Sequence, residues 1–324
     1  MNTLARISAL ISPALLAIAL TPLLLLSAAR GDKFGHGPHA FSIEFVAIGD
    51  PGNQADVSGF PNPAGRVDYA YRIGKYEISI DQVRKVAALG GPGITFFDWG
   101  YNDQWPAIDV NWLEAASFVN WLNTQTNSPP AYKFDARRDF QLWQPGDPGF
   151  DPGNPYRNRL ARYFLPSVDE WYKAAYYDPA ADVYYDYPTG SDAFPDGLDR
   201  VNDPTFDALF YEGYESRYPH EVTNVGKLSP YGTAGQGGSV FEWEETAADL
   251  VNSAPLERRG VRGGEFSQSG VLLASTMRFG APVFEGIGFR VASRAVPEPS
   301  AATLALLAAA GGRRLVGGRR RAST

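Results

Sequence analysis

Extended hydrophobic periodicity is scarce in this chain, and this scarcity constrains its fold more than any single motif does. Neither helical heptads nor long apolar–polar alternations run through its 324 residues. The chain instead carries 34 glycines, 25 prolines and 13% aromatic residues, which favours short elements joined by loops over a helical bundle. Because 44% of the positions are hydrophobic, such a chain can still bury one large core or two small ones.

Local signals predict where the few regular elements lie. The segments 41–48 and 69–78 are predicted as strands, and three short helices are predicted from their N-terminal residues. Those N-terminal pairs are Ser79 with Gln82, Asn111 with Glu114, and Ser167 with Glu170. The segment 129–155 has no periodicity, and its prolines predict a surface insertion. Asp147 and Asp151 within it do not have the spacing of an EF-hand calcium loop.

Two features of the composition exclude whole classes of function. The chain has no cysteine, which excludes disulfides, zinc–thiolate sites, iron–sulfur clusters and thiol nucleophiles. The net charge is −7, and the body is more acidic still because many arginines lie in the two terminal segments. A body of this charge does not favour nucleic acid as a partner.

The first 29 residues have the pattern of a secretory signal peptide. Arg6 is followed by an apolar run from Ile7 to Leu26, and small residues at 27–29 suit cleavage. An uncleaved membrane anchor is the alternative, but Pro13 and Pro22 favour cleavage. The next residues, 30–40, are polar and glycine-rich and are predicted to form a linker before a domain at 41–293.

The last residues, 294–324, have a second targeting pattern. Val296–Ser300 reads Val-Pro-Glu-Pro-Ser and precedes an apolar stretch, Ala301–Ala310, and an arginine cluster from Arg313 to Arg321. The stretch is too short to span a bilayer comfortably, so we expect a transient association with the membrane. The order resembles a PEP-CTERM sorting signal, and the resemblance implies an exosortase-type processing enzyme, exopolysaccharide as a partner, and a place on the cell envelope surface or in the extracellular matrix.

Six motifs between residues 41 and 293 resemble, in order, those of the formylglycine-generating-enzyme or sulfatase-modifying-factor family. They are Pro106–Trp112 with Ala115 and Ala116, Leu165–Trp171 with Ala174 and Ala175, Thr223–Gly226, Tyr231–Trp243, Arg262–Phe266 and Gly288–Val291. The resemblance implies a single C-type-lectin-like α+β domain with little regular structure. Within these motifs we expect structural roles for seven residues: Trp112, Trp171, Trp243, Arg262, Gly263, Gly264 and Arg290.

The resemblance also implies a copper-dependent oxidase chemistry that this chain lacks the residues to perform. The family's two catalytic cysteines would follow Gly264, where this chain has Glu265–Ser269 and then Val271–Leu273. Copper is therefore not expected, since copper(I) prefers sulfur ligands and Met277 alone offers one nearby. The resemblance further implies a structural calcium site, and the matching positions are Gly235, Gly238, Val240 and Glu242. Two family side chains are replaced there, by Gly235 and Ser239.

Three functions follow from these residues. The favoured one is an exported, non-catalytic binding module that uses tyrosines to stack on sugar rings: Tyr184, Tyr185, Tyr187, Tyr211 and Tyr214. The alternative is a hydrolase that uses carboxylates from the group Glu242, Glu244, Glu245 and Asp249. The least favoured is a formylglycine-generating oxidase. Glu242 is expected to be buried with Arg262 or Arg290 as its partner and to hold the fold together.

Overall fold

The computed structural model describes residues 30–98, 100, 102–198, 203–212 and 218–295. The predicted signal peptide and residues 296–324 of the predicted sorting segment lie outside this range. Within it, no helix combines the length and the apolar character that crossing a bilayer requires.

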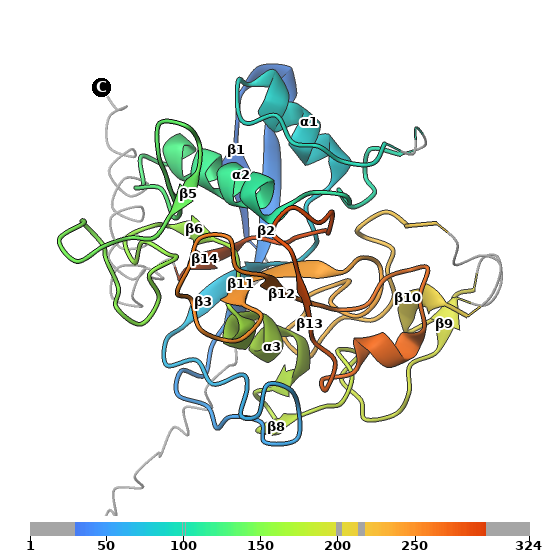
Figure 1. Ribbon diagram of the computed structural model, residues 1–324. Coiled ribbons are helices and arrows are strands. Elements are labelled where there is room, and N and C mark those ends of the chain that lie inside the picture. The colour runs from blue at the N-terminus through green and yellow to red at the C-terminus, as the bar shows by residue number, and fades with distance from the viewer. Residues whose placement is uncertain (1–29, 99, 101, 199–202, 213–217, 296–324) are drawn as a thin grey trace, which may run out of the picture.

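A five-stranded antiparallel sheet forms one part of the domain (Figure 1). Its strands follow the order β1-β2-β3-β14-β6. Their bounds are Arg30–Phe34 for β1, Phe41–Ile48 for β2, Tyr71–Gly74 for β3, Tyr163–Phe164 for β6 and Ala292–Arg294 for β14. Because β14 pairs with both β3 and β6, the end of the described chain is tied into the sheet in which it begins.

The predicted linker at 30–40 is wrong, because strand β1 occupies its first half. β1 pairs along its whole length with β2, and Phe34 is only 2% exposed. Asp32 accepts hydrogen bonds from Arg72 at 2.7 Å and from Tyr163 at 2.6 Å. Polar composition alone suggested a linker, but pairing with β2 and these cross-strand contacts stabilise a strand.

The three predicted helices are confirmed. They are α1 at Ile80–Ala88, α2 at Trp112–Gln125 and α3 at Val168–Tyr176, and each begins with a capping box. The capping residues are Ser79, Asn111 and Ser167, whose side chains accept hydrogen bonds from the backbone three residues ahead. Helix α2 packs against β6, and α3 packs against β11.

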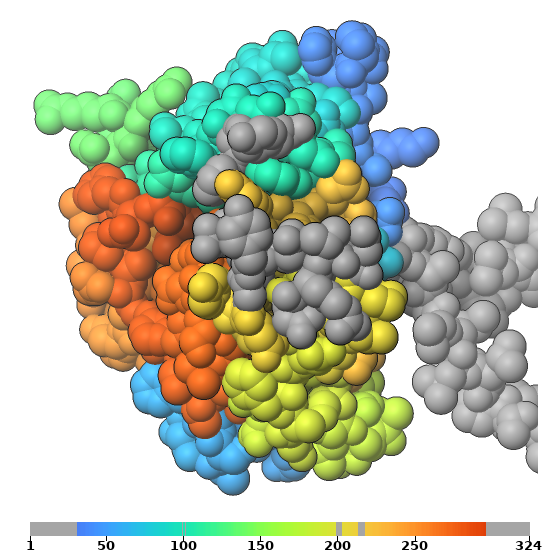
Figure 2. All heavy atoms as spheres, turned by 90° about the vertical axis from the view of Figure 1, so that its right-hand side faces the viewer, coloured from blue at the N-terminus to red at the C-terminus, as the bar shows by residue number. Residues whose placement is uncertain are grey.

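A second antiparallel sheet, β11-β12-β13, contains the motif residues Glu242, Trp243 and Arg262. Its strands are β11 at Glu242–Ala247, β12 at Arg259–Arg262 and β13 at Phe279–Ala281. Three short pairs complete the strands: β4 (Lys133–Phe134) with β5 (Phe140–Gln141), β7 (Tyr177–Asp178) with β8 (Val183–Tyr184), and β9 (Gly197–Leu198) with β10 (Ala208–Tyr211). Figure 2 shows the face on which β10 lies beside the 3-10 helix Gly270–Leu273, and Tyr211 donates its backbone N–H to the carbonyl of Gln268 there.

The segment 129–155 is not the plain surface insertion that the sequence predicted. Tyr132 and Phe140 are 1% and 2% exposed, and their rings lie 5.2 and 5.1 Å from that of Trp112. These aromatic side chains belong to the core formed by α2 and the main sheet. Isolated aromatics in a loop have no periodicity, so sequence pattern could not reveal their burial.

Candidate functional site

Strand β11 places three glutamates in the interior, and each is held by arginine. Glu242 is fully buried, and both of its oxygens accept hydrogen bonds from Arg290, at 2.5 and 2.6 Å. The indole of Trp171 donates to the same carboxylate at 2.9 Å. Burial lowers the pKa of Arg290, but Glu242 raises it further and holds it above its ordinary value. The pair is therefore charged and saturated with hydrogen bonds.

The second glutamate, Glu244, has Arg262 as its partner. Arg262 Nε donates to Glu244 at 2.8 Å, and Arg278 Nε donates to the other oxygen at 2.8 Å. Of the two arginines expected to pair with Glu242, Arg290 does so and Arg262 does not. Glu242 and Glu244 lie only two residues apart on β11 but meet different arginines, which spacing in the sequence could not resolve.

The third glutamate, Glu245, belongs to a network that the sequence did not reveal. Arg157 Nε lies 2.8 Å from Glu245 Oε2, and its terminal nitrogens donate to both oxygens of Glu170, at 2.8 and 2.9 Å. Tyr132 donates its hydroxyl to Glu245 at 2.7 Å. Burial would raise the pKa of Glu170, but Arg157 and the hydrogen bonds around it hold the pKa below its ordinary value. The sequence marked Glu170 only as a helix-capping residue, and no sequence pattern indicated that Arg157 would be buried beside it.

The carboxylates proposed for hydrolysis do not converge. Glu242, Glu244 and Glu245 are all 0% exposed and paired with different arginines, whereas Asp249 is exposed. No described cavity is lined by two of these four residues. The geometry required for two carboxylates to flank a glycosidic bond is therefore missing at this cluster.

The remaining motif residues are all buried. The indoles of Trp112 and Trp243 are 0% exposed and donate to the backbone carbonyls of Glu244 and Val110, at 3.1 and 2.8 Å. Gly263 and Gly264 have φ values of 99° and 72°, a region in which side chains other than glycine are strained.

Three of the four residues matched to calcium ligands lie in one turn, and the fourth, Glu242, follows it. The carboxylate of Glu242 is already bound by Arg290. Gly235 and Gly238 have φ values of 71° and 80°. A different carboxylate, that of Glu77, packs against the turn. A Cβ atom at position 235 would lie 2.5 Å from Glu77 Oε1, so Glu77 fills the space of a side chain there.

Glu77 is the most unusual carboxylate among the described residues. It lies between β3 and α1, it is 2% exposed, and neither of its oxygens has a hydrogen-bond partner in the described chain. Burial raises its pKa to about 8, and Glu242 adds to the rise, although the charge of Arg290 opposes it. The described residues contain no cluster of three or more acidic or histidine side chains that could hold a metal. A cation at this turn would therefore need backbone and hydroxyl oxygens beside Glu77, a donor set that calcium accepts.

The segment that replaces the family's cysteines forms a loop and the 3-10 helix Gly270–Leu273. Glu265 accepts hydrogen bonds from Ser267 at 2.7 Å and from Gln268 at 2.9 Å. Glu265 and Asp109 line a cavity of about 280 Å³ together with Phe97 and Phe241. The backbone carbonyl of Met277 accepts a hydrogen bond from Arg262.

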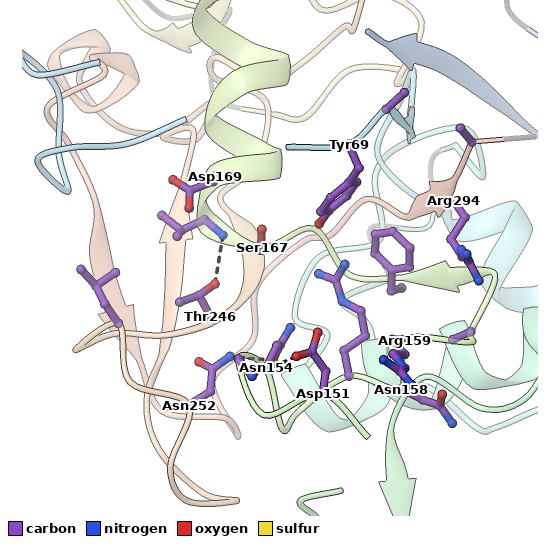
Figure 3. A pocket seen from close by; sticks show the side chains of 18 of the residues that line it. Tyr69, Asp151, Asn154, Asn158, Arg159, Ser167, Asp169, Thr246, Asn252 and Arg294 are labelled. Carbon is purple, nitrogen blue, oxygen red and sulfur yellow. Dashed lines mark hydrogen bonds between the residues drawn. The ribbon is translucent and has the colours of Figure 1, made fainter. Parts of the chain in front are cut away.

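A larger cleft of about 670 Å³ opens at the N-terminus of α3 (Figure 3). We call it the Tyr69 cleft. Its polar lining comes from α3, from β11 and β14, and from the loops around 151–159 and 252. Figure 3 shows Asp169 and Asn252 on one side of the cleft and Arg159 and Arg294 on the other. Burial raises the pKa of Asp169 above its ordinary value.

Tyr69 presents a fixed aromatic ring to this cleft. The residue is 50% exposed, yet its hydroxyl donates to the buried Glu170 at 2.7 Å. Glu170 is bound in turn by Arg157, which itself lines the cleft and lies over the ring of Phe164 at 3.9 Å. The buried ion pairs thus hold an exposed aromatic surface in one orientation.

The tyrosines that sequence proposed for sugar stacking do not share a cavity. The Tyr184 hydroxyl donates to the carbonyl of Gly65 at 2.8 Å, and its ring packs on Tyr172 and Tyr177. Tyr187 packs against Phe194, and Tyr211 is 50% exposed on β10. None of the described cavities is lined by Tyr184, Tyr185, Tyr187 or Tyr211, and Tyr214 lies outside the described residues. The prediction counted tyrosines in a loop, but Tyr184 and Tyr187 pack against other aromatic rings instead of lining a common site.

Comparisons with solved structures show the fold. Treponema denticola variable protein 1 is 19% identical to this chain, with a TM-score of 0.55 over 82% of this chain and 99% of that protein. CarF is 18% identical, with a TM-score of 0.55 over 78% of this chain and 99% of CarF. PvdO from Pseudomonas aeruginosa is 16% identical, with a TM-score of 0.48, and covers 82% of this chain and 98% of its own. No curated protein sequence matches the chain.

The sequence itself matches one family model over most of its length. The match covers residues 62–295 and is to the sulfatase-modifying factor enzyme 1-like domain. It agrees with the observed single, loop-rich α+β domain of C-type-lectin-like fold. The chain therefore belongs to the sulfatase-modifying factor enzyme 1-like family.

Proposed function

We propose that this protein is an exported, non-catalytic member of its family, and that it binds a segment of carbohydrate chain in the Tyr69 cleft. The observation that carries the proposal is the half-exposed Tyr69 ring, whose hydroxyl is anchored to buried Glu170. Sugar rings present apolar C–H faces, and a rigid aromatic side chain can cover such a face at little cost in conformational entropy.

The rim of the cleft supplies the polar groups that a sugar needs. Asn252, Asp151 and Asp169 offer hydrogen-bonding oxygens or nitrogens to hydroxyl groups. The guanidinium groups of Arg159 and Arg294 make no ion pair with a described residue, so they are available to acidic substituents on the chain. An open cleft that combines an anchored aromatic ring with many polar side chains suits a polyhydroxylated ligand.

The non-catalytic part of the proposal rests on the sequence and on the β11 carboxylates. The chain has no thiol for the family's oxidase step, and the three β11 glutamates are each saturated by arginine. The exported part rests on the two terminal segments alone. Those segments also support exopolysaccharide and an exosortase-type enzyme as partners.

Retention on immobilised polysaccharide tests the binding function. The purified protein is passed over alginate, cellulose and dextran, and the Kd is then measured for the polysaccharide that retains it. Tyr69→Ala is expected to weaken binding about five- to thirtyfold, the effect of losing about 1–2 kcal/mol of apolar contact.

Tyr211→Ala is the matched control, because Tyr69 and Tyr211 are both 50% exposed and only Tyr69 lines the cleft. Tyr211→Ala should bind as the unaltered protein does. Failure of all three matrices to retain the protein, or equal losses in the two variants, would reject the Tyr69 cleft as a carbohydrate site.

A further inference from the structure

The charged side chains of the Tyr69 cleft are divided between its two ends. The described residues that line the cleft and carry charge are Arg157, Arg159, Arg294, Asp151 and Asp169. Figure 3 shows Asp169 on one side of the cleft and Arg159 and Arg294 on the other. We call these sides the acidic end and the basic end. The two ends therefore favour different chemical groups of a ligand.

The basic end offers two guanidinium groups on a fixed backbone. Arg159 and Arg294 are exposed, and neither forms an ion pair with Asp151 or with another described residue. The backbone N–H of Arg159 donates to the carbonyl of Gly149 at 2.9 Å, and Arg294 pairs with Tyr71 in the main sheet. A guanidinium group can donate two hydrogen bonds to one carboxylate or sulfate, so this end suits an anionic group of a ligand.

The middle of the cleft, at Tyr69, does not suit an anion. Arg157 is already bound to Glu170 and Glu245, at 2.8 Å each, so it is not available to a ligand. One guanidinium group thus faces two carboxyl groups at the hydroxyl end of Tyr69, which itself donates to Glu170. The face of an aromatic ring is also negative, so it attracts the C–H groups of a sugar and not a carboxylate or a sulfate.

The acidic end suits neutral hydroxyl groups. Asp169 accepts a hydrogen bond from the backbone N–H of Gly65 at 2.8 Å, and Asn252 lies on the same side of the cleft. A carboxyl group and an amide can exchange hydrogen bonds with sugar hydroxyls. An anionic substituent placed here would meet a like charge whenever Asp169 is ionised.

We propose that the polysaccharide bound in the Tyr69 cleft is acidic, and that Arg159 and Arg294 bind the carboxylate or sulfate group of one of its sugar units. This inference rests on the proposed function and adds the chemical class of the ligand. Neutral parts of the chain lie on the ring of Tyr69 and against Asp169 and Asn252. The difference in charge between the two ends therefore sets the direction in which the polysaccharide lies.

Polysaccharides matched in backbone but not in charge test the inference on the full chain. The Kd is measured for dextran sulfate against dextran, and for alginate against alginate whose carboxylates are esterified with propylene glycol. We expect the charged member of one pair to bind about tenfold more tightly at low salt, and the preference to shrink as NaCl is raised. The pair that shows the preference tells sulfate from carboxylate. Equal binding within both pairs would overturn the inference and leave carbohydrate binding in place.

Substitutions at the basic end place the anion. Arg159→Gln and Arg294→Gln should each weaken binding of the charged polysaccharide about three- to fivefold and leave binding of its neutral partner unchanged. Arg137→Gln is the matched control and should change neither, because Arg137 is exposed, forms no ion pair with a described residue and does not line the cleft.

Tyr69→Ala separates this inference from the proposed function. If Tyr69→Ala weakens binding of the charged polysaccharide but neither arginine variant does, the acidic ligand is rejected and the carbohydrate site stands. If none of these three substitutions changes the Kd, or if no polysaccharide binds, both are rejected.

Discussion

Replacing Arg290 by methionine should destabilise the domain more than most single substitutions. Arg290 is 0% exposed and donates five hydrogen bonds, two to Glu242 and three to the carbonyls of Gly74, Lys75 and Ala234. Methionine fills much of the same volume but leaves Glu242 as a buried charge without a counter-charge. Breaking a buried pair in this way costs about 3–5 kcal/mol, which is a large share of the about 5–15 kcal/mol that stabilises a typical domain.

The assay is equilibrium unfolding in urea together with calorimetry, in a chelating buffer so that bound cations do not contribute. For a domain of about this size, each kcal/mol lowers Tm by about 2–4 °C, so the expected fall is about 6–20 °C. Arg66→Met is the control, because the Arg66–Asp68 pair is at a similar distance, 2.9 Å, but its side chains are 50% and 69% exposed. An exposed pair of this kind contributes about 0–1 kcal/mol.

A double variant distinguishes lost charge pairing from lost packing. Adding Glu242→Gln to Arg290→Met removes the uncompensated charge, so the double variant should be more stable than the sum of the two single losses predicts. The reasoning would be refuted if Arg290→Met cost no more than Arg66→Met, or if the two substitutions simply added.

Three further outcomes follow from the fold. Phe34→Ala should destabilise the domain by about 3 kcal/mol in urea unfolding, because Phe34 is buried against Phe41 and Tyr163. An effect near zero would restore the linker interpretation of residues 30–40. Because the pKa of Glu170 is lowered in the folded state, its stabilisation is present above pH 4.5 and is lost as the pH falls below that value. The stability of Glu170→Gln, measured by unfolding between pH 7 and pH 3, should therefore fall less steeply with acid than that of the unaltered protein, and an identical slope would contradict the assignment. Gly238→Ala should destabilise the domain by about 1–3 kcal/mol or more. Gly238 has a φ of 80°, and a Cβ there would lie 2.1 Å from the carbonyl oxygen of Leu209. Thermal unfolding measures the loss, and Gly146→Ala is the comparison because a Cβ at Gly146 would meet no atom within 4 Å.

The sequence predicted the elements whose signals are local. Ser79, Asn111 and Ser167 begin helices because a capping side chain acts within one turn, and strand β2 has its predicted bounds because the alternation lies within it. The sequence also predicted the family and the fold, because six motifs lie in fixed order along the chain. Signals of this kind need no knowledge of distant contacts.

The candidate sites depend on contacts between distant segments, and sequence predicted them poorly. Arg157 joins Glu170 and Glu245 across 13 and 88 positions, and nothing near Arg157 in sequence marks it as buried. Glu77 meets Gly235 only because the segment between β3 and α1 packs on the turn. Tyr69 was predicted as an ordinary strand residue. The tyrosine-rich loop was chosen by composition, but its residues Tyr184 and Tyr187 pack against other aromatic rings.

The most direct test of the binding function is to map the ligand on the protein by NMR. An oligosaccharide fragment of the retained polysaccharide is titrated into isotope-labelled protein, and backbone shifts are followed at saturation. The account predicts that the largest shifts fall on Tyr69, Asp169, Asn252 and Arg294, the residues around the Tyr69 cleft. Shifts confined to the loop around Tyr184–Tyr187, or to the cavity lined by Asp109 and Glu265, would contradict it.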